Sequence, residues 1–349
     1  MSDSRFGYSV YLTAFDRQRA LLERAAGAGE MVFLSLHISE EFSPDYRRQA
    51  ERVCLWLDEA GFRTIADVST KTVEQFGEPD LIRLAKRLRL WALRIDYGLT
   101  EEETAALARE MPLVVNASTT APQAARRIAA AGDLVMAMHN FYPRPETGLD
   151  GAYLLETTRS LQEAGLRVLA FIPGDRDLRG PVHEGLPTLE AHRGKLPSAG
   201  FADLVLRYGM DGVFVGDPGL SETERGRIRR FCGEGVLSVP ARLRPDWEAL
   251  YGRVFTCRVD SPANLVRFAE SREYACYGGP TPAADCGPRP RGAITLDNDR
   301  YGRYAGELQL CRAGFPADRR VNVVGQVPEE ALLLADSIPR GGRFALVRP

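Results

Sequence analysis

Acidic, amide and histidine side chains recur in this chain directly after short apolar runs. Paired carboxyl groups catalyse glycoside cleavage, and acidic, amide and guanidinium groups hydrogen-bond sugar hydroxyls. The polar residues at the ends of the runs are His37, Asp67, Arg94, Asp96, Asn116, His139, Asn140 and Asp217. Any one of them is explained equally well as a helix cap or as the partner of a nearby Arg. The whole set favours a site for a polar, sugar-like ligand.

The segment 173–198 is the longest connection that follows an apolar run. Two of its acids, Glu184 and Glu190, join Asp67, Asp96 and Asp217 as candidate catalytic carboxyl groups. The arginines and histidines of this segment are Arg176, Arg179, His183, His192 and Arg193, and Arg144 lies just beyond the run 134–140. Guanidinium forks bind phosphate through two parallel hydrogen bonds, whereas an isolated Arg is more often a solvated surface residue. The segment therefore predicts a site for a phosphorylated sugar.

Eight short apolar or β-branched runs must position these residues, and stretches with helical periodicity follow them. The runs are 6–12, 31–36, 63–68, 90–96, 113–116, 134–140, 167–172 and 212–217. This alternation predicts a (β/α)8 barrel, in which functional residues lie at the carboxyl ends of the strands. A doubly wound open sheet is the alternative, but it favours a Gly-rich first turn, whereas residues 12–15 read Leu-Thr-Ala-Phe.

The pattern changes after Gly233, where strand-like runs dominate. We expect short helices at 262–270 and 328–335 and a long Pro/Gly-rich loop at 278–292. The chain thus divides into a predicted barrel domain at 1–236 and a smaller β-rich domain at 237–349. Its 349 residues are enough for two such domains.

The charge balance argues against nucleic acid and membranes as partners. The formal net charge is −2, and no apolar stretch approaches the 18 or so residues that span a bilayer. The first ten residues lack a secretory signal pattern and the six cysteines are scattered, so we expect a cytoplasmic protein with reduced thiols. The sequence implies no cofactor, although Asp96, His139 and Asp217 remain a conceivable metal set.

Several strings of residues together resemble one family. They are Val115–Thr119, His139–Arg144, Phe171–Gly174, Arg179–Arg193, Thr295–Asn298, Tyr301–Tyr304 and Gly306–Leu308. These strings are similar to those of the MupG-type 6-phospho-N-acetylmuramidases, and the similarity runs from about Phe6 to the C-terminus. The resemblance implies a TIM barrel followed by a cyclophilin-like β-domain. It also implies a hydrolase of cell-wall recycling that cleaves N-acetylmuramic acid 6-phosphate from N-acetylglucosamine.

The resemblance does not itself assign the catalytic pair; among the candidate acids we expect Asp96 and Glu184, with Asp217 as the next candidate. Their separation, which distinguishes retention from inversion, is not encoded in the spacing, and the substrate's acetamido group is an alternative nucleophile. The expected substrate-binding residues of the barrel are His37, Asp67, Asn116, His139, Asn140, Arg144, Arg179, His183, Glu190, His192 and Arg193.

Four further residues of the expected substrate site lie in the second domain, namely Asp297, Asn298, Tyr301 and Arg303. One interpretation is a lid that completes the sugar site. The other is ordinary turn chemistry at Asp297-Asn298, with Tyr301 packed in a small core.

Two other classes of function fit the same residues. A phosphosugar isomerase, epimerase or aldolase also uses a barrel, but a Schiff-base aldolase needs a lysine at a strand end. The three lysines, Lys71, Lys86 and Lys195, lie elsewhere. A sugar-phosphate sensor that binds without turnover is the third class.

Overall fold

The computed structural model describes residues 5–27, 29–36, 45–96, 98–271 and 280–349. It divides into two compact units, one of residues 1–197 with 208–222 and the other of residues 198–207 with 223–349. The domain boundary near residue 237 stays a prediction.

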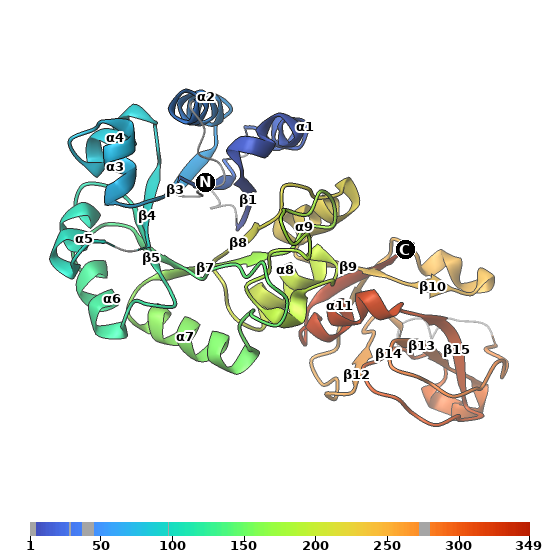
Figure 1. Ribbon diagram of the computed structural model, residues 1–349. Coiled ribbons are helices and arrows are strands. Elements are labelled where there is room, and N and C mark those ends of the chain that lie inside the picture. Colours follow the sequence, from blue (N-terminus) through green and yellow to red (C-terminus); the bar gives the residue numbers. More distant parts are fainter. Residues whose placement is uncertain (1–4, 28, 37–44, 97, 272–279) are drawn as a thin grey trace. The chain divides into compact units, whose positions relative to one another are not determined.

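The first unit is a closed barrel of eight parallel strands in sequence order (Figure 1). The strands are β1 (Phe6–Val10), β2 (Met31–Ser35), β3 (Arg63–Val68), β4 (Ala92–Ile95), β5 (Leu113–Asn116), β6 (Val135–Met138), β7 (Arg167–Ile172) and β8 (Gly212–Val215). Pairing of β8 with β1 closes the barrel. The predicted fold class is confirmed, and every predicted run contains one strand.

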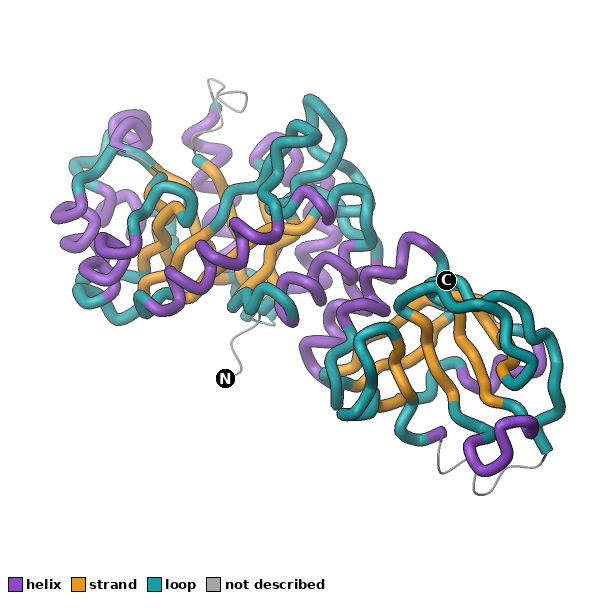
Figure 2. The backbone as a smooth tube through the Cα atoms, turned by 90° about the horizontal axis from the view of Figure 1, so that it is seen from below, coloured by secondary structure: helices purple, strands orange, loops and turns teal. Residues whose placement is uncertain are grey.

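Each strand is followed in the chain by one or more helices, and those of the first unit lie around its strands (Figure 2). They are α1 (Phe15–Ala25), α2 (Tyr46–Glu59), α3 (Thr70–Phe76), α4 (Leu81–Arg87), α5 (Glu101–Ala108), α6 (Pro122–Ala129), α7 (Gly151–Glu163), α8 (Pro197–Leu206) and α9 (Glu222–Glu234). The third crossover is split into α3 and α4, because Gly77 takes a left-handed conformation (φ 69°) and Asp80 caps a new helix. Helices α8 and α9 group with the second unit. Among the described residues, no helix combines the length and apolar character needed to cross a bilayer.

An apolar plug fills the barrel interior. Every second residue of the strands points inward, as the two-residue period of a strand requires. The plug consists of Met31, Phe33, Ile65, Ala92, Val114, Met136, Met138, Leu169, Phe171 and Phe214. The residues two positions further along each strand therefore form the next layer, at the carboxyl-terminal mouth.

The second unit contains two sheets. One has five strands, in the order β10 (Arg242–Leu243), β15 (Val321–Gln326), β13 (Ala293–Asp297), β14 (Leu308–Cys311) and β12 (Leu265–Arg267). The other has three, β11 (Val254–Thr256), β16 (Arg343–Val347) and β9 (Val236–Pro240). The short helical elements are η4 (Pro245–Leu250), η5 (Asp299–Tyr304), η6 (Glu329–Ala331) and α11 (Leu332–Ser337). The rings of Phe255, Phe268 and Phe344 pack together in the core.

One predicted helix of this unit is wrong. Residues 262–270 contain β12 instead, and it pairs with β14. Val266 and Phe268 are fully buried while Leu265 and Arg267 are partly exposed, so the burial alternates with the period of a strand. The helix predicted at 328–335 is present as η6 and α11.

Candidate functional site

A buried arginine organises the polar layer at the mouth of the barrel. The Nη1 atom of Arg94 donates to Oδ1 of Asp67 at 2.8 Å, and its Nη2 atom donates to Oδ1 of Asn140 at 2.5 Å. Nη2 also lies 3.4 Å from Oδ1 of Asp96. Only 4% of the Arg94 side chain is exposed, so its charge is compensated almost entirely by these oxygens. Three parts of the chain are held together by one guanidinium group.

Strand register explains this arrangement. Asp67 and Arg94 are direct neighbours across β3 and β4, and Ser35 is the neighbour of Asp67 on β2. Each of these side chains stands two residues beyond a member of the apolar plug, as does Asn116 on β5. All therefore point into the barrel rather than toward the helices. Ser35 was not among the expected site residues, yet the two-residue alternation identifies it.

Asp96 is the most accessible carboxylate of this layer, with 32% of its side chain exposed. Its Oδ1 accepts a hydrogen bond from Nδ2 of Asn116 at 2.6 Å, and the Asn116 amide oxygen in turn accepts from the backbone N–H of Ser118 at 2.9 Å. Among the described residues, no group donates to the Oδ2 atom of Asp96. The carboxylate is thus oriented at one oxygen and open at the other.

A cavity of about 260 Å³ lies over this cluster. Its polar lining includes Ser35, Asp67, Arg94, Asp96 and Asn140, and its aromatic lining is Phe33, Phe141, Tyr142 and Phe171. The ring of Phe171 packs edge-on against Phe33 and Phe141 at centroid distances of 5.3 and 5.1 Å, which fixes the aromatic wall. Aromatic faces beside paired polar groups suit a sugar ring, whose own surface is part apolar and part hydroxyl.

A second cavity, of about 450 Å³, lies among the loops after β1 and β7. Three basic residues, Arg17, Arg179 and His183, line it. The Arg179 guanidinium stacks on the Tyr11 ring, 4.4 Å from the ring centre, and Arg17 Nε lies 3.6 Å from a carboxylate oxygen of Asp177. Both Arg179 and His183 were expected at the site. Arg17 was not, because on α1 it is indistinguishable in sequence from a solvated helix residue.

Asp217 holds the loop after β7. Its Oδ2 accepts from the backbone N–H groups of Gly174 (2.8 Å) and Leu186 (3.0 Å), and its Oδ1 accepts from that of Arg179 (2.9 Å). Burial raises the pKa of Asp217, and these three hydrogen bonds oppose that shift. A side chain at Gly174 would place its Cβ 2.2 Å from the carbonyl oxygen of Gly219, so the loop passes too close for any other residue. Both oxygens of Asp217 thus serve the loop backbone.

Glu190 and Arg193 form a second hydrogen-bond network. Arg193 donates to both carboxylate oxygens of Glu190 at 2.7 and 2.8 Å, and to the carbonyl oxygens of Gly185 and Tyr142 at 2.9 Å each. Glu190 also accepts from the backbone N–H groups of residues 146 and 148. The guanidinium of Arg193 is the main cause that lowers the pKa of Glu190 to about 2. The pair ties the loop after β6 to the loop after β7.

The remaining expected residues of the barrel are dispersed. His139 is fully buried, its Nε2 atom lies 3.2 Å from the Thr158 hydroxyl on α7, and burial lowers its pKa to about 4. It stands one residue off the inward alternation and so faces the helices. His192 is likewise fully buried, whereas Arg144 and Glu184 are exposed. His37 lies outside the described residues.

In the second unit, the Asn298 side chain follows the turn interpretation. Its oxygen accepts from the backbone N–H of Arg300 at 3.1 Å, and its nitrogen donates to Oδ1 of Asn322 at 2.9 Å. Arg303 is exposed, and its Nη2 donates to the hydroxyl of Tyr304 at 2.6 Å. Asn298 therefore shapes the start of η5.

The carboxyl group of Asp297 is different, because it is buried and no described residue donates a hydrogen bond to it. Burial, and secondarily the charge of Glu307, raise the pKa of Asp297 to about 7. The Tyr301 hydroxyl lies 3.4 Å from a carboxylate oxygen of Asp318 nearby. A substrate-binding role for Asp297 and Tyr301 stays a prediction.

Among the residues that the structure describes, no three His, Cys, Asp or Glu side chains come together as a group that could hold a metal ion. Asp96, His139 and Asp217 in particular point in different directions, as their hydrogen-bond partners show. The described polar groups that line the mouth cavity are carboxylates, an amide, a guanidinium group and hydroxyl groups.

Comparison with known proteins gives matches over nearly the whole chain. Residues 6–230 match the family described as 6-phospho-N-acetylmuramidase, N-terminal, and residues 241–347 match its C-terminal counterpart. A conserved Enterococcus faecalis protein of unknown function is 29% identical with a TM-score of 0.85, over 99% of this chain and 96% of that one. An uncharacterised B. cereus protein shares the fold at 22% identity, with a TM-score of 0.79 over 99% of both chains. No curated protein matches.

Proposed function

The chain belongs to the 6-phospho-N-acetylmuramidase family, whose name denotes a glycosidase, and from this premise we propose its substrate and its site. The proposed reaction is hydrolysis of the bond between N-acetylmuramic acid 6-phosphate and N-acetylglucosamine, in the recycling of cell-wall sugars in the cytoplasm. The Arg94 cluster is the observation that carries this proposal, because it places two carboxylates on one aromatic-walled cavity. Glycoside hydrolysis requires a pair of carboxyl groups in most families.

Asp96 is the proposed catalytic carboxyl group. Its Oδ1 is held by Asn116, and no residue that the structure describes donates to its Oδ2, which leaves that oxygen for a reacting atom. Asp67 is more buried and is bonded to Arg94, which suits a group that orients the substrate or its acetamido nitrogen. Glu184 is exposed on the loop after β7 and remains the candidate for a second reacting carboxyl group. Asp217 is assigned to loop positioning because its oxygens accept backbone hydrogen bonds.

The second cavity is the proposed site of the 6-phosphate. Arg17 and Arg179 bring two guanidinium groups to it, and His183 adds a ring nitrogen. Nδ1 of His183 lies 2.6 Å from the carbonyl oxygen of Leu178, which orients the ring. A phosphate monoester carries up to two negative charges and accepts several hydrogen bonds, so it matches two guanidinium forks. Arg193 is not assigned to the phosphate site because its N–H groups already donate to oxygen atoms of the protein.

The test is incubation of the protein with the phosphorylated disaccharide and, in parallel, with the same disaccharide lacking the phosphate. We expect release of free N-acetylglucosamine from the first and much slower release from the second, measured by mass spectrometry. No release from either substrate would contradict the hydrolase proposal. Equal release from both would contradict the phosphate site alone. Saturable binding of the phosphorylated sugar without any release would favour the sensor.

A further inference from the structure

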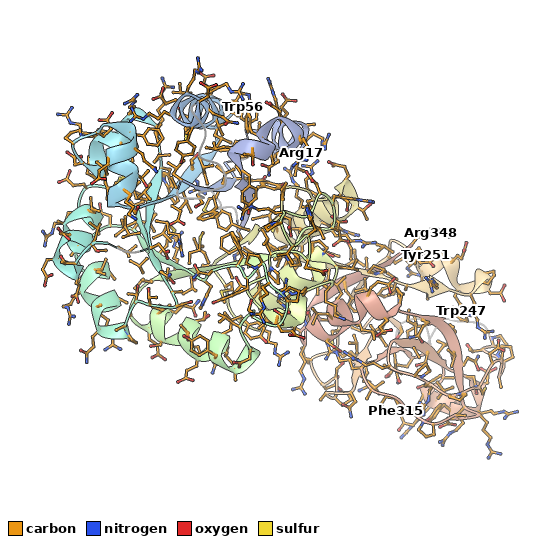
Figure 3. The ribbon with its side chains drawn as sticks, viewed as in Figure 1. Arg17, Trp56, Trp247, Tyr251, Phe315 and Arg348 are labelled. Atoms are coloured by element: carbon orange, nitrogen blue, oxygen red, sulfur yellow. The ribbon has the colours of Figure 1, made fainter. Side chains whose placement is uncertain are left out.

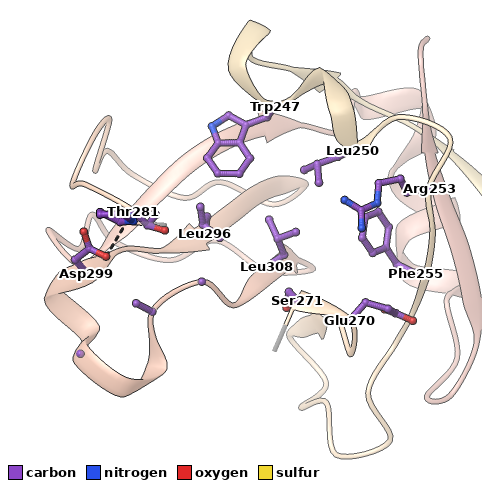
Figure 4. A pocket seen from close by; sticks show the side chains of 14 residues that line it. Trp247, Leu250, Arg253, Phe255, Glu270, Ser271, Thr281, Leu296, Asp299 and Leu308 are labelled. Atoms are coloured by element: carbon purple, nitrogen blue, oxygen red, sulfur yellow. Dashed lines mark hydrogen bonds between the residues drawn. The ribbon is translucent and has the colours of Figure 1, made fainter. Parts of the chain in front are cut away.

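The cavity over the Arg94 cluster differs in its wall from a cavity of about 600 Å³ in the second unit. The wall of the latter includes the Trp247 indole of η4 (Figure 3), which is directed at the same space as Leu296 and Leu308 (Figure 4). The mouth cavity of the barrel has polar side chains beside its aromatic ones. The directions of their donor and acceptor atoms therefore decide which ligand atoms the mouth can bind.

Asn140 offers hydrogen-bond donors to a ligand in the mouth cavity. Its Oδ1 accepts from Nη2 of Arg94 at 2.5 Å, and because a guanidinium group can only donate, the oxygen is the amide atom that faces Arg94. Its Nδ2 makes no hydrogen bond to any residue that the structure describes. Asn140 lines the cavity and is only partly buried, so its two N–H groups are left for an oxygen atom of a ligand.

The backbone around Asn140 lies beyond the end of the β6–β7 ladder. The register of the two strands ends with Met138 beside Leu169, and the His139 N–H donates to the carbonyl oxygen of Leu169 at 2.9 Å. Strand β7 continues to Ile172, whereas β6 ends at Met138. A peptide group within a parallel pair finds its partner on the neighbouring strand, and the peptide groups of Phe171 and Asn140 need another partner here.

The Thr188 side chain supplies that partner. Its hydroxyl group accepts from the backbone N–H of Phe171 at 2.9 Å and donates to the carbonyl oxygen of Asn140 at 2.8 Å. The backbone N–H of Thr188 donates to the carbonyl oxygen of Phe171 at 3.0 Å, and the residue is fully buried. One hydroxyl group thus joins the aromatic wall of the cavity, at Phe171, to the amide at Asn140.

Backbone bonds hold the segment around Thr188 independently of this hydroxyl group. The carbonyl oxygen of Pro187 accepts from the N–H of Tyr142, and that of Thr188 accepts from the N–H of Leu149, each at 2.9 Å. These bonds involve no side-chain atom of Thr188, so they remain available when its side chain is replaced. The contribution of the hydroxyl group can therefore be tested without removing the anchors of the loop.

We propose that Thr188 is a positioning residue, whose hydroxyl group holds Asn140 so that the amide N–H groups meet an oxygen atom of the bound sugar. This inference rests on the proposed function, which places the sugar in the mouth cavity. Thr188 is absent from the cavity lining and acts through Asn140. Serine keeps the hydroxyl group, whereas valine has nearly the size of threonine and lacks it.

The experiment compares Thr188→Val and Thr188→Ser in hydrolysis of the phosphorylated disaccharide. Valine removes the hydrogen bonds that fix one substrate contact, so kcat/KM should fall about tenfold, whereas serine should keep it within about twofold of the unaltered protein. Thr64→Val is the matched control and should change nothing, because Thr64 is buried on β3 and its hydroxyl has no partner among the described residues. Equal kcat/KM for Thr188→Val and the unaltered protein would overturn the proposal.

Combination of Thr188→Val with Asn140→Ala separates positioning from a purely structural role. If the hydroxyl group acts through Asn140, the valine substitution should lower kcat/KM about tenfold when Asn140 is present and by less than about twofold when it is alanine. A general loosening of the fold would lower kcat/KM by the same factor in both backgrounds. That result would overturn the proposal.

Urea unfolding of the same four proteins tests the inference without any substrate. Loss of the hydroxyl group weakens the hold of Asn140 on Arg94, so Asn140→Ala should shift the unfolding midpoint less in the Thr188→Val background. Equal shifts in both backgrounds would overturn the proposal even if the unaltered protein hydrolyses the disaccharide. Unequal shifts without any hydrolysis would contradict the proposed function and support the link between Thr188 and Asn140.

A second variant covers the case in which Thr188→Val does not fold. Thr188→Ala leaves room for a water molecule between the N–H of Phe171 and the carbonyl oxygen of Asn140, so it should be better tolerated. It then replaces valine in both combinations with Asn140→Ala, and additive effects in them would overturn the proposal in the same way.

Discussion

Two arginines at the mouth of the barrel, Arg94 and Arg193, differ in what their guanidinium groups hold. Arg94 bonds side-chain oxygens of Asp67 and Asn140 and approaches Asp96, whose second oxygen has no donor among the described residues. Arg193 bonds backbone carbonyls and both oxygens of Glu190. The first arrangement orients groups that a ligand can reach, and the second fastens two loops. Both residues are arginines, so residue type does not distinguish their roles. The acceptor atoms that each guanidinium group binds do.

Removal of the Arg94 side chain should have the largest effect. Arg94→Met removes the guanidinium partner of the buried Asp67 carboxylate, which costs about 3–5 kcal/mol of unfolding free energy for a broken buried pair. Urea unfolding followed by circular dichroism measures this loss. The double variant Arg94→Met/Asp67→Leu should regain much of the stability and none of the activity. If the double variant is as unstable as the single one, the buried charge is not the cause.

Asp96→Asn should separate activity from stability. The amide keeps the shape and the hydrogen bond at one oxygen but cannot act as acid, base or nucleophile, so kcat should fall about 10³-fold, or about 4 kcal/mol in the barrier. The unfolding midpoint should stay close to that of the unaltered protein. Asp133→Asn, at an exposed position before β6, is the matched control and should change neither. Full activity of Asp96→Asn would remove this residue from the mechanism.

Arg193→Lys should lower the stability of the fold and leave substrate binding nearly unchanged. One ammonium group cannot replace a fork that reaches Glu190 and two loop carbonyls, so we expect a loss of about 2 kcal/mol in stability. The KM for the phosphorylated sugar should change little when measured below the unfolding transition. A large rise of KM specific to the phosphorylated substrate would return Arg193 to the phosphate site.

The low pKa of Glu190 predicts an acid-dependent effect on stability. The folded protein lowers this pKa from 4.5 to about 2, so the ionised group stabilises the fold above pH 4.5, and this contribution is lost as the pH falls toward 2. In that window the melting temperature of the unaltered protein should decline more steeply than that of Glu190→Gln. Parallel curves for the two proteins would show that the pair adds no stability.

Arg17→Ala should have the smallest effect and tests the second cavity. Arg17 is exposed and its ion pair with Asp177 is long at 3.6 Å, so the fold should not depend on it. Loss of one phosphate contact should raise KM about tenfold with kcat unchanged, or about 1.4 kcal/mol. Arg19→Ala, on the same helix but absent from the cavity lining, serves as the control. Equal KM values for both variants would exclude Arg17 from phosphate binding.

The sequence was sufficient to predict the barrel, because eight apolar runs each became a strand buried on both faces. It also predicted that Asp67, Asp96, Asn116 and Asn140 meet, since the carboxyl ends of parallel strands share one rim. His139 and Asp217 stand one residue off the inward alternation, with hydrogen-bond partners at Thr158 and in the backbone of the loop after β7. That alternation is readable in the sequence, whereas a functional role for either residue stays a prediction.

Other parts of the site were beyond prediction from spacing. The roles of Glu190 and Arg193 depend on carbonyl groups of loops whose course the sequence does not specify. Arg17 enters a cavity only because the loop after β7 passes near α1. In the second unit, β12 was mistaken for a helix because three residues are too few to show a period.

The Arg94 cluster has a consequence for how this protein can change in evolution. Its contacts and those of Asp96 join residues of β3, β4, β5 and the end of β6, whereas the second cavity is built mainly from the loops after β1, β7 and β8. The two cavities therefore belong largely to different stretches of the chain. Recombination or insertion in the loops of one stretch can therefore reshape the second cavity while the acids of the other stretch stay in place.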